Sequence, residues 1–254
     1  MKRVMLTVAY DGTAYHGWQL EPTGITVEEV LNRQLSALLG EEIRVSGASR
    51  TDAGVHAKGN LCVLDTESRI PPEKIAAALN PYLPKDIVVI RSEETAPDFH
   101  PRRCDSIKTY EYTILNRALP DPLRCRYVAH FRRPLDAARM QEAAAALIGE
   151  HDFAAFCAAG SQALTTVRRI TTLTVRREED EIRIRVSGTG FLYNMVRIIS
   201  GTLMQAGLGA LPPEELPRIL ASGDRSQAGP TAPPEGLCLE KIDLYPEGFP
   251  EGLW

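Results

Sequence analysis

The sequence lacks several features that would assign it to a common functional class. No run of about 18 apolar residues occurs among its 254 residues, and its first residues alternate in polarity where a signal peptide would be continuously apolar, so we expect a cytoplasmic protein. The five cysteines include no C-x-x-C pair, and no two of the five histidines have the i, i+4 spacing of a helical metal site. Neither a P-loop motif nor a strand-following G-x-G-x-x-G motif occurs. We therefore expect neither a metal site nor a nucleotide cofactor.

Positive charge is concentrated in one segment of a chain whose formal net charge is −4. Between His100 and Arg133, eight Lys or Arg residues stand against three acidic residues, with aromatic residues interleaved. Because salt confines the influence of each charge to about 8 to 10 Å, such a local cluster matters more than the total charge. The segment is typical either of a solvated basic face or of a surface that binds a phosphate backbone. Arg102 and Lys108 are candidate contacts to such a backbone.

The first half of the chain alternates between strand-like and helix-like patterns. Residues 3–10 alternate as in a half-buried strand. Residues 27–39 carry an apolar helical stripe that follows a candidate capping residue, Thr26, and stops at Gly40. The remaining patterns predict strands at residues 42–47, 60–66 and 86–92 and a helix over about 72–80. The predicted order is β-α-β-β-α-β.

The second half repeats this order with insertions. Its patterns predict strands at residues 108–115, 169–177, 181–188 and 236–244 and helices at 134–149 and around 190–207. Two such units indicate an α+β protein built from two duplicated ferredoxin-like domains, with largely antiparallel sheets covered by helices on one face. The polar segment 95–108 is the predicted boundary, which gives an N-terminal domain of residues 1–105 and a C-terminal domain of residues 106–254.

Three side chains and the turn before the last predicted strand, "GPTAPPEGLCLE" (229–240), stand out as candidates for chemistry, and each has a purely structural alternative. Asp52 lies in the small-residue turn "SRTDAG", where an aspartate commonly caps backbone amides. Tyr110 lies on a predicted strand and could be an ordinary core aromatic. Arg197 lies on an apolar helix, where a buried guanidinium needs an anionic partner of some kind. If that partner is Asp52, the cation would keep the carboxylate ionised and ready to act as a nucleophile or base.

Six segments resemble the TruA-type tRNA pseudouridine synthases, in order and over essentially the whole chain. They are "YDGTAYHGWQ" (10–19), "SRTDAGVHAKGN" (49–60), "FHPR" followed by "KTYEY" (99–112), "GEHDFAAF" (149–156), "GFLYNMVRIISGTL" (190–203) and "TAPPEGLCL" (231–239). The resemblance implies an isomerase that converts uridine to pseudouridine at positions 38, 39 and 40 in the anticodon stem-loop of tRNA. It implies no cofactor and no metal, and it implies a homodimer.

The resemblance also implies roles for individual residues. Asp52 takes the place of the essential aspartate, Arg197 that of the basic residue paired with it, and Tyr110 that of the tyrosine that stacks on the target base. Arg50 matches an arginine that helps to extrude the base, and Leu237 matches an apolar residue that lines the pocket. Together with Arg102 and Lys108, these are the expected catalytic and substrate-binding residues.

The sequence departs from the family pattern at two positions beside the aspartate. Ser49 stands where the family usually has glycine, and Asn60 stands where it usually has glutamine. Because serine tolerates a positive φ poorly, Ser49 could change the conformation of the turn. Two other classes of function compete with the isomerase: a non-catalytic tRNA-binding module, and a metabolic enzyme that takes a small acidic substrate at the basic segment.

Overall fold

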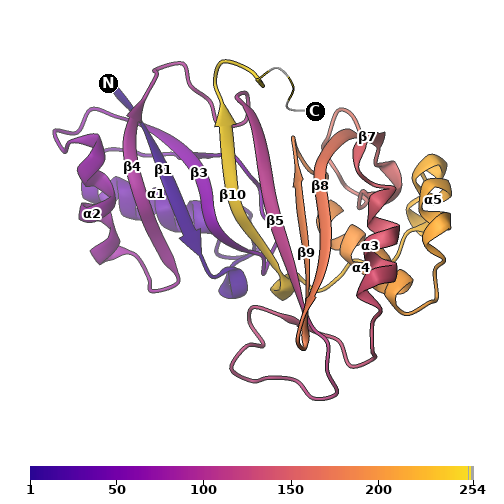
Figure 1. Ribbon diagram of the computed structural model, residues 1–254. Coiled ribbons are helices and arrows are strands. Elements are labelled where there is room, and N and C mark those ends of the chain that lie inside the picture. Colours follow the sequence, from indigo (N-terminus) through magenta and orange to yellow (C-terminus); the bar gives the residue numbers. More distant parts are fainter. Residues whose placement is uncertain (251, 253–254) are drawn as a thin grey trace. The chain divides into compact units, whose positions relative to one another are not determined.

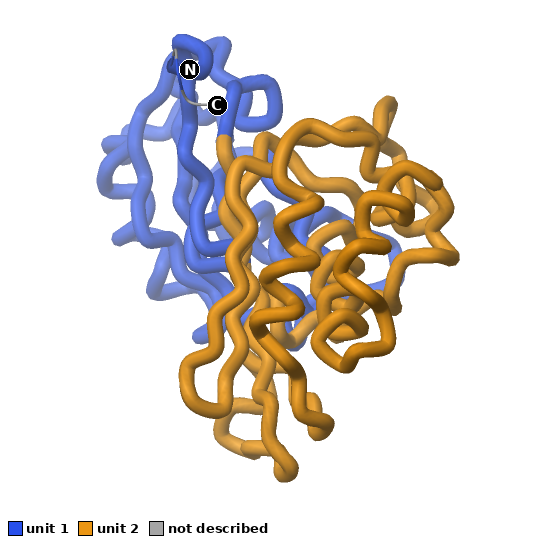
Figure 2. Tube along the Cα trace, turned by 45° about the vertical axis from the view of Figure 1, so that its right-hand side comes forward, with its two compact units in different colours: residues 1–106, 239–253 blue, residues 107–238, 254 orange. Residues whose placement is uncertain are grey.

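The computed structural model describes residues 1–250 and 252, and the chain divides into two compact units (Figure 2). Among the described residues, the first unit contains residues 1–106, 239–250 and 252, and the second contains Ile107–Cys238. Each combines helices with mostly antiparallel strands, so the mixed α and β content expected from the sequence is confirmed. None of the helices in the described part of the chain is long and apolar enough to cross a bilayer.

The first unit is a sheet with helices packed on it. Its elements are β1 (Lys2–Tyr10), α1 (Val27–Leu39), β2 (Ser46–Gly47), β3 (His56–Thr66), α2 (Ile75–Leu79), β4 (Ile87–Thr95) and the C-terminal strand β10 (Leu237–Tyr245). Strand β1 pairs antiparallel with both β3 and β4, β2 pairs with β3, and β10 is the next strand beyond β3. Helix α1 passes behind these strands in Figure 1.

The alternation and capping signals of the first unit are confirmed. Val4, Leu6 and Val8 on β1 are fully buried, as the period-two pattern predicts. Helix α1 begins after Thr26, whose hydroxyl accepts a hydrogen bond from the Glu29 amide at 3.2 Å. It ends at Gly40, which takes the left-handed conformation with φ 74°.

Two predicted elements of the first unit were wrong in extent. The strand expected over residues 42–47 shrinks to the two residues of β2, because side chains of α1 take its amides: Ile43 donates to Ser36 Oγ at 2.9 Å, and Val45 donates to Asn32 Oδ1 at 2.8 Å. The helix expected over 72–80 breaks into the 3₁₀ turn Pro72–Lys74, the short α2 and a second 3₁₀ turn, Asn80–Tyr82.

The second unit is a sheet whose helices pack on one face. Its elements are β5 (Asp105–Leu115), β6 (Ala129–His130), α3 (Ala137–Ala145), β7 (Gly149–Asp152), β8 (Val167–Glu178), β9 (Glu181–Gly188), α4 (Met195–Gly207) and α5 (Leu216–Ser222). The strands follow the order β5-β9-β8-β7 with antiparallel pairing, and the short β6 pairs parallel with β5. Helix α3 packs against α4 and β8.

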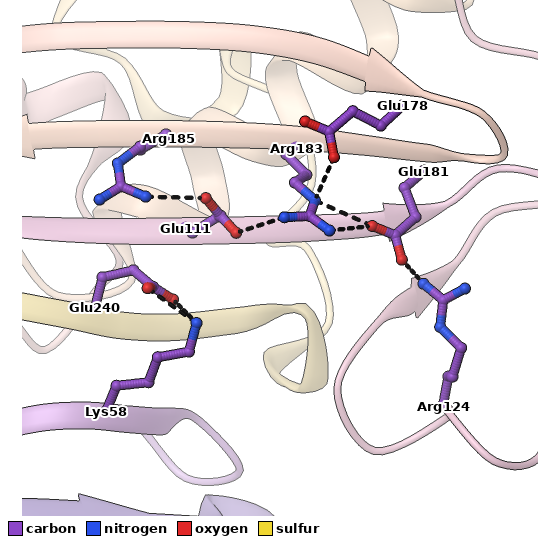
Figure 3. Close-up of polar contacts among 8 residues, drawn as sticks. All are labelled: Lys58, Glu111, Arg124, Glu178, Glu181, Arg183, Arg185 and Glu240. Atoms are coloured by element: carbon purple, nitrogen blue, oxygen red, sulfur yellow. Dashed lines mark hydrogen bonds and ion pairs between the residues drawn. The ribbon is translucent and has the colours of Figure 1, made fainter.

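Alternate residues of β5 and β9 give this sheet one apolar and one charged face. Tyr112, Ile114 and the residues of β9 in register with them are buried. The opposite face carries an ion-pair network in which Arg183 lies between Glu111 and Glu181, and Arg185 contacts Glu111 at 3.2 Å (Figure 3). An antiparallel sheet with helices on one face commonly leaves its other face polar in this way.

Two differences from the predicted elements of the second unit have physical causes. Helix α4 begins at Met195 and not near residue 190, because Asn194 takes the left-handed conformation with φ 58° and cannot continue a helix. Helix α5 was not predicted, because Pro212 and Pro213 stand just before it and Pro217 lies within it. Pro213 opens a 3₁₀ turn and Pro217 lies in the first turn of α5, where a missing amide hydrogen costs nothing.

Candidate functional site

Asp52 lies in the loop that leads from β2 into β3. Its side chain is half-buried, and its carbonyl accepts a hydrogen bond from the Val55 amide at 3.1 Å, which closes a turn over Ala53 and Gly54. Gly54 has φ 78°, a conformation that favours glycine. The turn by itself therefore accounts for the small residues that follow Asp52, independently of any approach by a substrate.

A buried hydrogen-bond network fixes the residues just before Asp52. We call Tyr10, Ser49, Thr51 and Asn60 the loop brace. The Asn60 side chain accepts from the Ser49 amide at 3.2 Å and donates to the Ser49 carbonyl at 2.9 Å. It also donates to the Tyr10 hydroxyl at 3.3 Å, and that hydroxyl lies 2.7 Å from the Thr51 hydroxyl. All four residues are at most 6 % exposed, so water does not compete for these bonds.

The segment 12–18 packs directly on the Asp52 loop. Trp18 donates its amide hydrogen to the Thr51 carbonyl at 3.0 Å, and Gly54 donates to the Tyr15 carbonyl at 3.2 Å. Gly17 has φ 88°, and a Cβ atom there would lie 2.6 Å from the Thr51 carbonyl oxygen. The glycine in "YHGWQ" thus permits a close approach that no other residue allows.

The start of β3 is held to the same segment through a histidine. His56 is buried, and its Nδ1 atom accepts a hydrogen bond from the Gly12 amide at 3.0 Å. The same Nδ1 atom also lies 3.2 Å from Asp11 Oδ1, so His56 contacts two neighbouring residues, Asp11 and Gly12. His56 therefore anchors the loop at its far end.

Arg197 projects from the first turn of α4. Its Nε donates to the Ala232 carbonyl at 2.8 Å and its Nη1 to Asn194 Oδ1 at 2.8 Å, while the Ala232 amide donates back to the Arg197 carbonyl at 3.1 Å. These bonds fix the guanidinium plane and attach the segment before β10 to the helix. The two acceptors named here are neutral oxygens of the second unit, and the ion pair with Asp52 stays a prediction.

Tyr110 and Leu237 also belong to the second unit, where both are buried. Tyr110 lies on β5, and its ring meets Phe191 edge-on with a centroid distance of 5.3 Å. Leu237 opens β10 directly after a turn whose Pro233 carbonyl accepts from the Tyr112 hydroxyl at 2.9 Å. Contacts from β5 and α4 therefore fix the turn that precedes Leu237.

The basic segment is less uniform than its composition indicates. Arg117 is paired with Asp121 and Asp180, and Arg124 is paired with Glu181 (Figure 3), so internal carboxylates neutralise part of it. Lys108 lies on β5, in register with Gly188. Arg102, in contrast, belongs to the first unit, as do Asp52 and Arg50.

Sequence reasoning named Asp52 but did not predict the loop brace. The available signal was Asn60, a polar residue on the same face of its strand as Cys62 and Leu64. A side-chain amide buried on that face needs hydrogen-bond partners. The two family departures, Ser49 and Asn60, turn out to bond each other. Among the described residues only Glu179 and Asn194 have positive φ without being glycine, so serine at position 49 causes no strain of that kind.

Within residues 1–250 and 252, no three His, Cys, Asp or Glu side chains are grouped so that they could hold a metal ion.

Comparisons with known proteins identify the family to which the chain is similar. A family model described as tRNA pseudouridine synthase matches residues 6–102 and 143–245. The chain is 48 % identical over 242 residues to tRNA pseudouridine synthase A 2 of Clostridium perfringens, covering 95 % of this chain and 99 % of that protein.

Two further relatives agree with this match. The tRNA pseudouridine synthase A of Thermoanaerobacter sp. (strain X514) is 48 % identical over 242 residues, again covering 95 % of this chain and 99 % of the relative. That of Moorella thermoacetica is 47 % identical over 245 residues, covering 96 % of this chain and all of the relative. The aspartate turn, its buried brace and the arginine of α4 thus lie within a chain that belongs to the tRNA pseudouridine synthase family.

Proposed function

We propose that this protein isomerises uridine to pseudouridine in tRNA, at positions 38, 39 and 40 of the anticodon stem-loop. The observation that carries the proposal is the position of Asp52, directly after a backbone segment that a buried side-chain network holds in place. A fixed carboxylate suits a reaction that needs one ionised acid beside a ribose. The names of the relatives support tRNA as the substrate.

The reaction needs acid–base chemistry but no oxidant or cofactor. The C1′–N1 bond breaks, the uracil turns, and C5 joins C1′; N1 gains a proton and C5 gives up its hydrogen as a proton to solvent. In this scheme the Asp52 carboxylate acts either as the nucleophile at C1′ or as the base at C2′. The target base must first leave its stack, which costs a few kcal/mol, and stacking on Tyr110 returns about 1 to 3 kcal/mol.

The other candidate residues serve the same step. Arg197 pairs with Asp52 and keeps it ionised, since a cation within about 4 to 6 Å lowers the pKa of a carboxyl group. Arg50 helps to extrude the base, and Leu237 lines the uracil pocket. Arg102 and Lys108 contact the RNA.

We further infer two ferredoxin-like domains, residues 1–105 with the Asp52 loop and residues 106–254 that complete the active site, although the compact unit that contains residues 1–106 also takes in the part of β10 from Leu239. The order of β1, α1, β2, β3, α2 and β4 supports this for the first half. The protein acts in the cytoplasm as a homodimer, because the basic segment of one chain is short for gripping a whole tRNA. Light scattering at micromolar concentration tests the dimer, and a mass of one chain contradicts it.

Tritium release tests the isomerase directly. Unmodified tRNA carrying tritium at uracil C5 loses it to solvent when pseudouridine forms. The wild-type protein is expected to release the label, and Asp52→Asn and Asp52→Ala are expected to abolish release while retaining tRNA binding. Asp98→Asn, which removes an exposed carboxylate of the same unit, serves as the matched control and should release tritium at the wild-type rate.

The outcomes separate the three classes of function. Release that persists in both Asp52 variants removes Asp52 from the mechanism. Salt-dependent tRNA binding by the wild-type protein without any release would indicate a non-catalytic RNA-binding module. No affinity for tRNA at all would favour a small acidic substrate.

A further inference from the structure

Three polar side chains meet at one corner of the first unit. One of them, Ser46, stands six residues before Asp52 along the chain. We call Ser46, His100 and Arg102 the basic corner. The Ser46 hydroxyl oxygen lies 3.4 Å from His100 Nε2 and 3.3 Å from Arg102 Nη2. Ser46 is fixed by the pairing of β2 with β3. The turn that carries His100 is tied to β1, because Arg3 donates to the Phe99 carbonyl at 3.0 Å.

Two side-chain donors of the basic corner point to the Ser46 hydroxyl oxygen. His100 Nδ1 accepts from the Arg102 amide at 3.2 Å, so the hydrogen of the neutral imidazole is on Nε2 and points to Ser46. The Ser46 oxygen thus accepts from His100 and from the Arg102 guanidinium. Its own hydroxyl hydrogen has no acceptor among the residues that the structure describes. The acceptors of the corner, His100 Nδ1 and the Ser46 oxygen, are thus already used within it, whereas the Ser46 hydroxyl hydrogen can still be donated.

The positive charge around the basic corner is only partly compensated. Partial burial lowers the pKa of Arg102, and the positive charge of Arg50 lowers it further, whereas the negative charge of Glu28 raises it. Neither Arg50 nor Arg103 makes an ion pair with any described residue.

His100 experiences the same surplus of positive charge. Its pKa is lowered by burial first, and then by the charges of Arg102, Arg103 and Arg3. Of these three cations, Arg3 is neutralised by Asp65 at 2.6 Å. The fold thus holds like charges together at an electrostatic cost, which a bound anion would offset.

We propose that the basic corner is a binding site for one phosphodiester group of the RNA backbone, with the Arg102 guanidinium and the Ser46 hydroxyl as donors and His100 orienting Ser46. The inference rests on the proposed function, and it specifies where the protein binds the phosphate backbone of the tRNA. Guanidinium and hydroxyl donors on a fixed backbone match the oxygens of a phosphate group. Six residues separate Ser46 from Asp52 and can span at most about 22 Å, so the bound phosphate lies within a few nucleotides' reach of the candidate catalytic carboxylate.

Salt-dependent binding of unmodified tRNA tests the site. Arg102→Gln removes one phosphate contact, so the slope of log affinity against log salt concentration should become shallower by about 0.7 to 1. Ser46→Ala removes a donor without charge, so it should weaken binding about three- to tenfold at unchanged slope. Arg69→Gln is the matched control, because Arg69 is an exposed arginine of the same unit outside the corner, and it should keep the wild-type slope.

An unchanged slope in Arg102→Gln, or an equal loss in Arg69→Gln, overturns the phosphate site. Circular dichroism melting of each variant separates a loss of binding from a loss of folding. The tritium assay on the wild-type protein distinguishes this failure from failure of the proposed function. If the wild-type protein releases tritium while the slopes are equal, only the phosphate site fails; if it binds tRNA without release, the slopes still decide the site.

Discussion

The loop brace and the basic corner both belong to the first unit, and they differ in how their polar groups find hydrogen-bond partners. In the brace, the Asn60 amide meets its partners on the Ser49 backbone in both directions, at 2.9 and 3.2 Å, and all of these groups are buried. In the corner, the contacts to Ser46 are 3.3 and 3.4 Å long, and two side-chain donors share its one oxygen. A network whose groups all find partners supports structure, whereas a cluster with surplus donors and positive charge can bind an anion.

The largest expected effect comes from removing the Asn60 amide, which makes most of the hydrogen bonds in the loop brace. Asn60→Leu leaves the Ser49 amide and carbonyl buried without the partners that Asn60 supplies, so the free energy of unfolding should fall by about 3 kcal/mol, and kcat should fall with it. Denaturant unfolding and tritium release measure the two effects.

Asn80 offers a matched control for that variant. Its side chain makes the same reciprocal pair with Val89, at 2.9 Å in both directions, but far along the chain from the loop. Asn80→Leu should therefore lower stability by a comparable amount and leave kcat unchanged. Equal losses of kcat in the two variants would mean that the brace acts only through general stability.

A smaller effect is expected from Tyr10→Phe. The substitution removes the hydroxyl that joins Thr51 to Asn60 but keeps the buried ring, so stability should fall by only about 1 kcal/mol. Because Thr51 directly precedes Asp52, the loss should appear in kcat more than in KM. A KM effect with kcat unchanged would show that the hydroxyl does not position the loop.

The smallest expected effect is a shift in one titration. The pKa of His100 is lowered in the folded protein, so the unfolded chain binds more protons between the ordinary value of about 6.5 and the lower folded value, and stability falls as pH is lowered through that window. The charged groups that set this value are Arg3 on β1 and Arg102 and Arg103 in its own turn. A phosphate bound at the corner offsets their charge, so the pKa should rise when tRNA is added.

Imidazole NMR measures that titration, with His100→Gln identifying the signal. A pKa that does not move on addition of saturating tRNA would contradict the phosphate site. Inorganic phosphate in place of tRNA provides a simpler probe of the same donors.

Sequence patterns predicted elements whose signals are local and missed those whose causes are tertiary. Helix α1 was predicted with both ends because Thr26 and Gly40 act on their own neighbours. The reduction of β2 was not predictable, since it depends on Asn32 and Ser36 reaching across from α1.

The same distinction applies to the candidate site. Asp52 was identifiable from a contiguous motif and its family resemblance. The brace depends on the register of β1 against β3, which places Val8 opposite Asn60 and brings Tyr10 within reach. No pattern within either strand encodes that register, so the partners of Asn60 could be known only from the fold.

The assignment of β10 to the first unit has a consequence for the order in which the protein is made. Residues from Leu239 on belong to this unit, and β10 lies next to β3, yet they are synthesised after the entire second unit. While the ribosome is still translating residues 107–238, β3 is paired with β1 and, over two residues, with β2, but the rest of its second edge still lacks β10, and such an edge invites pairing with other chains. The Asp52 loop leads into that same strand. The nascent protein therefore completes the sheet behind its candidate catalytic loop only when almost the whole chain has left the ribosome.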